Sequence, residues 1–154
     1  MLAIGDTAPD FSLPDQHGTQ RSLSELVTTN GVILYFYPAD FTLVCTRQAC
    51  LLRDVHEELA EEGLKVVGVS PQDVNSHTKF IARHKLPFDL LADTDKQVIE
   101  QYGCLLPLGL GVRRRTFLID NAMQIRDILT ADLRAGRHQK FARNARTLLA
   151  ENQD

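Results

Sequence analysis

The chain has 154 residues, 44% of them hydrophobic and 24% charged, which is ordinary for a soluble globular protein and long enough for one buried core. Its net charge of −3 indicates neither a nucleic acid nor a membrane surface as partner, and no apolar run approaches the roughly 18 residues of a membrane span. The N-terminus shows no basic segment followed by an apolar run, so no secretory signal is visible and we expect a cytoplasmic protein.

Hydrophobic periods of 2 and 3.6 residues alternate along the chain, which predicts an α/β fold with a central mixed β-sheet flanked by helices. We expect a single domain over residues 1–154, because no linker or repeat interrupts the pattern. In chain order, the predicted elements are extended pieces over 8–18, a capped helical turn over 22–26, a buried strand over 32–37, a helix over 45–62, a buried strand over 64–69, a helix over 73–84, a short strand over 88–91, a short helix over 98–102, a hairpin of 116–119 with 124–129, and a helix over 136–150.

Two of the three cysteines, Cys45 and Cys50, follow the buried strand predicted at 32–37. Pro38 ends that strand, and Cys45 begins the next helix, where free backbone N–H groups favour the thiolate that makes cysteine a nucleophile. Thr42 can present its hydroxyl to the same spot, donating to the thiolate or to a substrate oxygen. An odd number of cysteines argues against a disulfide scaffold and favours a transient, catalytic pair.

The spacing of the pair implies a conformational change. Five residues of helix would separate the two Cα atoms by roughly 8.5–9 Å, whereas a disulfide tolerates at most about 7 Å. Cys45 and Cys50 can therefore bond only if at least one turn of helix unwinds, unlike a Cys-x-x-Cys pair. The alternative is that Cys50 is a small core residue on the buried face of the helix.

Nine of the 17 lysines and arginines lie between Arg113 and Arg146, against three aspartates there. This excess fits an anionic ligand, but a solvated helix face with one functional arginine is the interpretation we favour. Strand alternation places Arg114 on one face of its strand, and Arg113 with Arg115 on the other. Only one face can meet a thiolate, and we expect Arg113 and Arg115 to lie in solvent.

Three motifs in order carry a family resemblance. Pro-x-x-x-(Thr/Ser)-x-x-Cys is matched by Pro38, Thr42 and Cys45, and Cys-Thr-x-Gln-Ala-Cys-x-Leu-Arg-Asp by residues 45–54. Arg-x-(Ser/Thr)-Phe-Leu-Ile-Asp is matched by residues 114–120. On these motifs the chain resembles the peroxiredoxins, in particular the group called bacterioferritin comigratory protein or peroxiredoxin Q, over nearly its whole length.

The resemblance implies a thioredoxin-like fold and a thiol-dependent peroxidase that reduces hydrogen peroxide and organic hydroperoxides in antioxidant defence. Cys45 would be the peroxidatic cysteine that becomes a sulfenic acid, and Cys50 the resolving cysteine that forms an intramolecular disulfide with it. Arg114 would lower the pKa of Cys45 and bind a peroxide oxygen. Gln48 stands where it could orient this arginine.

The same resemblance implies the protein's partners, whereas the residues themselves argue against a cofactor. A thioredoxin-like or glutaredoxin-like donor would restore the thiols, and the protein would be a monomer, with weak dimers possible. We expect no metal, nucleotide or flavin cofactor, because no Gly-rich phosphate loop follows a strand and the histidines lack metal-ligand spacing. Two other functions stay open, a disulfide oxidoreductase acting on proteins and a non-catalytic redox sensor. Each of the histidines is expected at the surface, at positions 17, 56, 77, 84 and 138.

The chain departs from the group at Leu43-Val44, where relatives commonly carry Pro-Gly before the peroxidatic cysteine. Together with Phe41, this pair would make the rim of the site more apolar and favour organic hydroperoxides. The motifs leave Cys104 unmatched. We expect a buried spectator there, with an intermolecular or substitute resolving thiol as the alternative.

Overall fold

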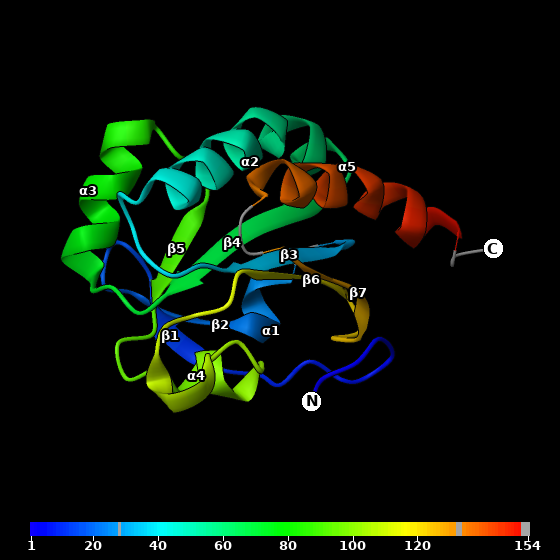
Figure 1. The fold of residues 1–154 in the computed structure, drawn as a ribbon. Coiled ribbons are helices and arrows are strands. Elements are labelled where there is room, and N and C mark those ends of the chain that lie inside the picture. The colour runs from blue at the N-terminus through cyan, green and yellow to red at the C-terminus, as the bar shows by residue number, and fades with distance from the viewer. Residues whose placement is uncertain (28, 132–133, 152–154) are drawn as a thin grey trace.

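A five-stranded mixed sheet forms the centre of the molecule in the computed structural model, which describes residues 1–27, 29–131 and 134–151 (Figure 1). The strand order is β5-β4-β3-β6-β7. Strands β3, β4 and β5 run parallel to one another, and β6 is antiparallel to both of its neighbours, β3 and β7. The strands are β1 (Ser12–Pro14), β2 (Gln20–Ser22), β3 (Gly31–Phe36), β4 (Leu64–Ser70), β5 (Asp89–Ala92), β6 (Arg115–Asp120) and β7 (Ile125–Thr130), and the helices are α1 (Leu23–Leu26), α2 (Leu43–Glu61), α3 (Val74–His84), α4 (Gln97–Gln101) and α5 (Ala135–Glu151), with a 3-10 turn at Pro107–Gly109.

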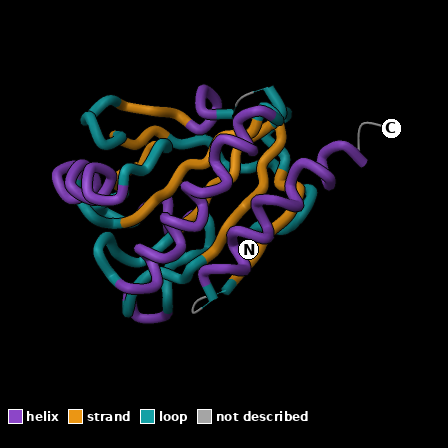
Figure 2. Tube along the Cα trace, turned by 90° about the horizontal axis from the view of Figure 1, so that it is seen from above, coloured by secondary structure: helices purple, strands orange, loops and turns teal. Residues whose placement is uncertain are grey.

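Two hydrophobic cores cover the two faces of this sheet. On one face α2 and α5 pack side by side, and Figure 2 shows both helices lying across the strands. On the other face lie α1, α4 and the small β1-β2 sheet (Figure 1). Alternation along β3 sends Ile33 and Tyr35 to the first core and Val32 and Leu34 to the second. Burial on both faces explains why β3 is continuously apolar in sequence.

The main predicted strands and helices are confirmed, with ends that shift by one or two residues. The capped turn is a capping box, in which Ser22 and Glu25 satisfy each other's backbone N–H groups. The helix predicted from Cys45 begins earlier, at Leu43. Residues 121–124 connect β6 to β7, and the Asp120 carboxylate accepts hydrogen bonds from two backbone N–H groups within this connection.

Gly31, at the start of β3, is required by close packing. Its φ is +139°, and a Cβ atom there would lie 2.3 Å from the carbonyl oxygen of Ile119. Any side chain would push β3 away from β6 at the centre of the sheet. Of the helices that the structure describes, none has both the length and the apolar character needed to cross a membrane.

Candidate active site

Cys45 lies at the junction of the central strand and the long helix that covers it. The chain leaves β3, passes Pro38 and enters α2 at Leu43, so Cys45 is the third residue of the helix. The first turn of a helix directs N–H groups without intrahelical acceptors toward its start, which favours negative charge there. The side chain of Cys45 is buried, with 2% of the residue exposed.

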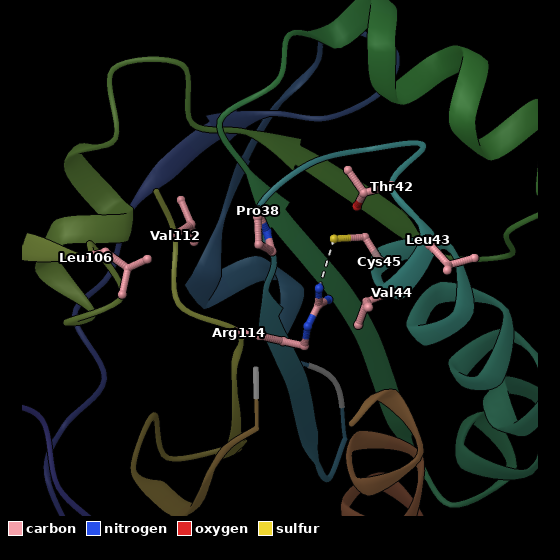
Figure 3. A pocket seen from close by; sticks show the side chains of 8 residues that line it. All are labelled: Pro38, Thr42, Leu43, Val44, Cys45, Leu106, Val112 and Arg114. Atoms are coloured by element: carbon pink, nitrogen blue, oxygen red, sulfur yellow. Dashed lines mark hydrogen bonds between the residues drawn. The ribbon is translucent and has the colours of Figure 1, made fainter. Parts of the chain in front are cut away.

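A pocket of about 610 Å³ opens beside this cysteine. Figure 3 shows Leu106 and Val112 on the opposite side of the pocket from Leu43, with Cys45 and Arg114 between them. Most of the lining side chains are apolar, so a carbon-bearing ligand would fit next to the sulfur. The lining residues are Pro38, Thr42, Leu43, Val44, Cys45, Leu106, Val112 and Arg114.

Arg114 is the cation of the site. Its Nη2 donates to Cys45 Sγ at 3.1 Å (Figure 3), and its Nη1 donates to Gln48 Oε1. Arg114 precedes β6 on the face that carries Thr116 and Leu118, so strand alternation directs it toward α2. Only 3% of the residue is exposed, so the guanidinium makes both donations out of contact with bulk water.

Thr42 and Pro38 complete the pocket, although the hydroxyl of Thr42 is not directed at the thiolate. Thr42 Oγ1 donates to the carbonyl oxygen of Ala39 at 2.9 Å, which leaves its lone pairs available to a ligand proton. Pro38 lines the pocket, and its own carbonyl accepts a hydrogen bond from Gln72. Four of the expected side chains therefore meet at one pocket, and Gln48 holds Arg114 from behind.

Cys50 lies within the same continuous helix as Cys45, and both thiols are free. It is half-buried rather than part of the core, and its Sγ lies 3.9 Å from His84 Nδ1. In this fully folded state the two sulfurs cannot bond, because regular helix separates their Cα atoms by roughly 8.5–9 Å.

The expectation that Arg113 and Arg115 lie in solvent is wrong for Arg115. Arg115 faces the opposite core, with 6% of the residue exposed, and its Nε donates to Thr130 Oγ1 at 2.9 Å. Arg113 is half-buried. The alternation of faces was correct, but α4 and the following turn cover the second face of the sheet as well.

The histidines were also expected at the surface, and two of them are fully buried. His77 pairs with Asp40 through Nδ1 at 2.7 Å, and its Nε2 lies 3.1 Å from the Leu91 carbonyl oxygen. His138 bonds Thr116 Oγ1 through Nδ1 at 2.6 Å. Each imidazole is buried because strands and loops distant in sequence supply polar partners for both of its nitrogens.

Around the pocket, the rim is apolar as expected, although Phe41 is not one of the lining residues. Leu43 is 86% exposed at the mouth, while the Phe41 ring packs edge-on against Phe80 with centroids 5.2 Å apart. Cys104 is fully buried in the core opposite the site, as expected for a spectator. Its Sγ donates to the Tyr102 carbonyl oxygen at 3.6 Å.

Several residues of the site went unrecognised in the sequence. Leu106 and Val112 reach the pocket from the loop before β6, and no local pattern marks them. Asp40, between the motif residues Pro38 and Thr42, does not line the pocket but anchors the loop before α2 through His77. Within the described ranges 1–27, 29–131 and 134–151, no group of three or more His, Cys, Asp or Glu side chains could hold a metal ion.

Comparison with known proteins places this geometry in one family. The model of the AhpC/TSA family matches residues 4–128. Over 125 residues the chain is 42% identical to peroxiredoxin bcp of Coxiella burnetii, covering 77% of this chain and 82% of that protein. It is 41% identical over 120 residues to the chloroplastic peroxiredoxin Q of Oryza sativa subsp. japonica, covering 77% of this chain and 55% of that protein.

Solved structures agree with the sequence relatives. Peroxidoxin BcpB from Mycobacterium tuberculosis superposes with a TM-score of 0.88 at 36% identity, covering 98% of each chain. The bacterioferritin comigratory protein of Xanthomonas campestris superposes with a TM-score of 0.84 at 25% identity, covering 97% of this chain and 98% of that one. The central sheet and the helices that cover it thus follow a shared architecture.

Proposed function

The chain belongs to the AhpC/TSA family, as a thiol-dependent peroxidase of the peroxiredoxin type, and on that premise we propose that Cys45 is the thiolate that attacks the peroxide. The observation that carries this assignment is the 3.1 Å contact from Arg114 Nη2 to Cys45 Sγ at the base of an open pocket. A buried guanidinium favours the thiolate and stays charged throughout the reaction.

The first chemical step follows from this arrangement. The Cys45 thiolate attacks one oxygen of the peroxide, the O–O bond breaks, and the leaving alkoxide or hydroxide takes up a proton to become alcohol or water. Cys45 is oxidised to a sulfenic acid. Arg114 can donate to an oxygen on which charge develops, and Thr42 can accept a hydrogen bond from the peroxide O–H. Pro38 shapes the pocket wall, and Gln48 orients the guanidinium.

Cys50 is the resolving cysteine in this proposal. Its thiolate attacks the sulfenic sulfur of Cys45, a disulfide forms, and hydroxide leaves and is protonated to water. The regular helix between them must first open, so each turnover includes local unwinding of α2. Family members use thioredoxin-type reductants, and we extend this to thioredoxin or a glutaredoxin-like protein as the donor that reduces the Cys45–Cys50 disulfide.

The remaining attributes are also proposals. We place the protein in the cytoplasm, because recycling of a disulfide needs a reducing compartment, whereas the plant relatives are named as chloroplastic. Residues 1–154 form a single domain that acts as a monomer, with weak dimers possible. We assign no nucleic-acid or membrane partner and no cofactor, since cysteine chemistry and an external dithiol suffice for the reaction.

Organic hydroperoxides are the substrates that this pocket favours. Leu43, Val44, Leu106 and Val112 offer apolar contact to a carbon chain beside Cys45. The Xanthomonas campestris relative is described as having alkyl peroxide reduction activity. We expect a higher kcat/KM for cumene hydroperoxide than for hydrogen peroxide. An equal or higher value for hydrogen peroxide would reject this preference.

Peroxide consumption coupled to thioredoxin tests the assignment of both cysteines. Cys45→Ser should abolish peroxide reduction, while Cys50→Ser should form the sulfenic acid at the wild-type rate but lose recycling by thioredoxin. Intact turnover in Cys50→Ser would make Cys104 the resolving thiol instead. Insulin reduction without peroxide would favour a protein disulfide oxidoreductase, and oxidation without turnover under excess reductant would favour a redox sensor.

A further inference from the structure

The side chain that faces Cys50 comes from a different helix. His84, the last residue of α3, places its Nδ1 3.9 Å from Cys50 Sγ, within reach of a hydrogen bond to sulfur. The two residues are 34 positions apart in sequence, and nothing in the peroxide-binding pocket involves His84. Thiol and imidazole within hydrogen-bond reach form the arrangement that activates cysteine nucleophiles.

Two contacts hold His84 in this position. Its ring packs edge-on against Phe80, one turn earlier in α3, with centroids 5.1 Å apart. Its backbone carbonyl accepts a hydrogen bond from Arg53 Nη1 at 2.8 Å. Because Arg53 lies one turn after Cys50 in α2, this bond ties the end of α3 to the helix that carries the thiol. The imidazole is therefore held in place rather than free in solvent.

Unwinding of α2 should leave this pair intact. Helices open most easily from their ends, and release of residues 43–47 is enough to move Cys45. Cys50 lies beyond that segment, where Leu52 and Val55 are fully buried in the core and Arg53 is bonded to α3. The Cys45 sulfenic acid therefore moves toward Cys50, which stays beside His84 and is partly exposed.

We propose that His84 is a catalytic base for the resolving step, accepting the proton of the Cys50 thiol. The proton passes from Cys50 Sγ to His84 Nδ1, and the thiolate attacks the Cys45 sulfenic sulfur. The S–S bond forms as the S–O bond breaks, and the departing hydroxide takes a proton to become water. Cys45 is thereby reduced from sulfenic acid to disulfide as Cys50 is oxidised. This inference rests on the proposed role of Cys50.

The charged neighbours of the pair come from α2 and from the end of α3. Arg53 donates to the His84 carbonyl oxygen and also forms an ion pair with Asp54, which is largely exposed. Arg83 and Lys85, the neighbours of His84, are exposed cations. An unassisted thiol is mostly protonated at pH 7, whereas a neutral imidazole is a competent acceptor at that pH. The base therefore raises the fraction of Cys50 that can attack.

A single-turnover experiment separates the two chemical steps. Reduced protein is mixed with one equivalent of hydrogen peroxide and quenched at intervals with dimedone and N-ethylmaleimide, and peptide mapping by mass spectrometry quantifies sulfenic acid and the Cys45–Cys50 disulfide. For His84→Asn and His84→Gln at pH 7 we expect disulfide formation about 10- to 100-fold slower and sulfenic acid formation within about twofold of wild type. The matched control is His17→Asn, an exposed histidine in a turn, which should leave both rates unchanged.

Two further readouts distinguish a base from a structural contact. The wild-type rate of disulfide formation should level off near neutral pH, whereas the rate in His84→Asn should keep rising toward pH 9, because an unassisted thiol ionises only near pH 8.5. Added imidazole should restore disulfide formation in His84→Ala. A His84→Asn protein that forms the disulfide as fast as wild type, or faster, would overturn the inference. If wild type itself forms no Cys45–Cys50 disulfide, the proposed function fails instead.

Discussion

Arg114 and Cys45 form a single hydrogen-bonded unit at the candidate active site. Arg114 lies with 3% of the residue exposed between Cys45 Sγ and Gln48 Oε1, and it donates to both. Two donations in different directions from one planar group require a guanidinium, since an ammonium is a point charge without this fork. The conservative replacement by lysine should therefore not be conservative for the reaction.

Arg114→Lys should lower the second-order rate constant of sulfenic acid formation by about 10- to 100-fold, equivalent to roughly 1.4–2.7 kcal/mol of transition-state stabilisation. The measurement is competition for hydrogen peroxide against a reference peroxidase under single-turnover conditions. Arg115→Lys is the matched control, because Arg115 is a buried arginine on the opposite face of the sheet. Equal losses in both variants would show that the effect reflects folding rather than contact with Cys45.

In the proposed cycle, the long helix α2 is both the scaffold of the site and the segment that unwinds. Its N-terminal turn carries Leu43, Val44 and Cys45 to the pocket, while its later turns bury Leu52, Val55 and Leu59 in the core. The first turn is therefore packed less firmly against the core than the later turns are. Val44, for example, lines the pocket and not the core. Local unwinding can begin at the N-terminal end without breaking the packing against the sheet.

Oxidation to the intramolecular disulfide should open the start of α2 only. Amide hydrogens of residues 46–50 should exchange at least tenfold faster in the disulfide form than in the reduced form, because their acceptors lie in the unwound turn. Amides of Leu52 to Leu59 should keep their protection, as should those of α5, the internal reference. Hydrogen exchange with mass spectrometry on both redox states provides the test. Loss of protection along the whole of α2 would contradict unwinding from the end.

At the scale of the whole molecule, a buried polar network joins the loop before α2 to the edge strand β5. Asp40 accepts from Tyr37 Oη at 2.6 Å, Ser76 Oγ at 2.7 Å and His77 Nδ1 at 2.7 Å. On its other side, His77 Nε2 lies 3.1 Å from the carbonyl oxygen of Leu91 in β5. The network thus connects the β3–α2 loop, α3 and β5.

Asp40→Asn should reduce the free energy of unfolding by about 3–5 kcal/mol, because it removes the buried carboxylate that pairs with Tyr37, Ser76 and His77. Chemical denaturation at pH 7 measures this. The matched control, Ser76→Ala, removes one hydroxyl donor to the same carboxylate and should cost only about 1 kcal/mol.

The network also makes the free energy of unfolding depend on pH in the acid range. Burial by itself would raise the pKa of Asp40, but the hydrogen bond and charge of His77, with the hydroxyls of Tyr37 and Ser76, outweigh burial and lower the pKa below its ordinary value. A depressed carboxyl pKa stabilises the fold above pH 4 and ceases to do so as the pH falls through the lowered value. Denaturation between pH 5 and 2 should show a shallower loss of stability in Asp40→Asn than in wild type. Identical slopes would mean that other carboxylates dominate.

The helices and strands that were predicted correctly are those marked by local patterns in the sequence. Val32 to Phe36 form a continuous apolar run, Ser22 and Glu25 have capping-box spacing, and Gly63 follows the end of α2, so these elements were predicted within one or two residues. The pattern could not show that Arg115 is covered by α4, or that His77 and His138 have partners on other elements. Burial on the second face of a strand depends on what packs there, and alternation alone does not reveal it.

The sequence by itself determined the α/β order, the motif residues around Cys45, and the need for helix unwinding, because each depends on residues within one element or on fixed helix geometry. Only the tertiary structure decided which side chains meet. Arg114 reaches Cys45 across 69 positions, His84 reaches Cys50 across 34, and Leu106 with Val112 closes the pocket from a loop. Such contacts form when helices cover a sheet whose neighbouring strands are distant in the chain, and no local pattern of residues encodes that distance.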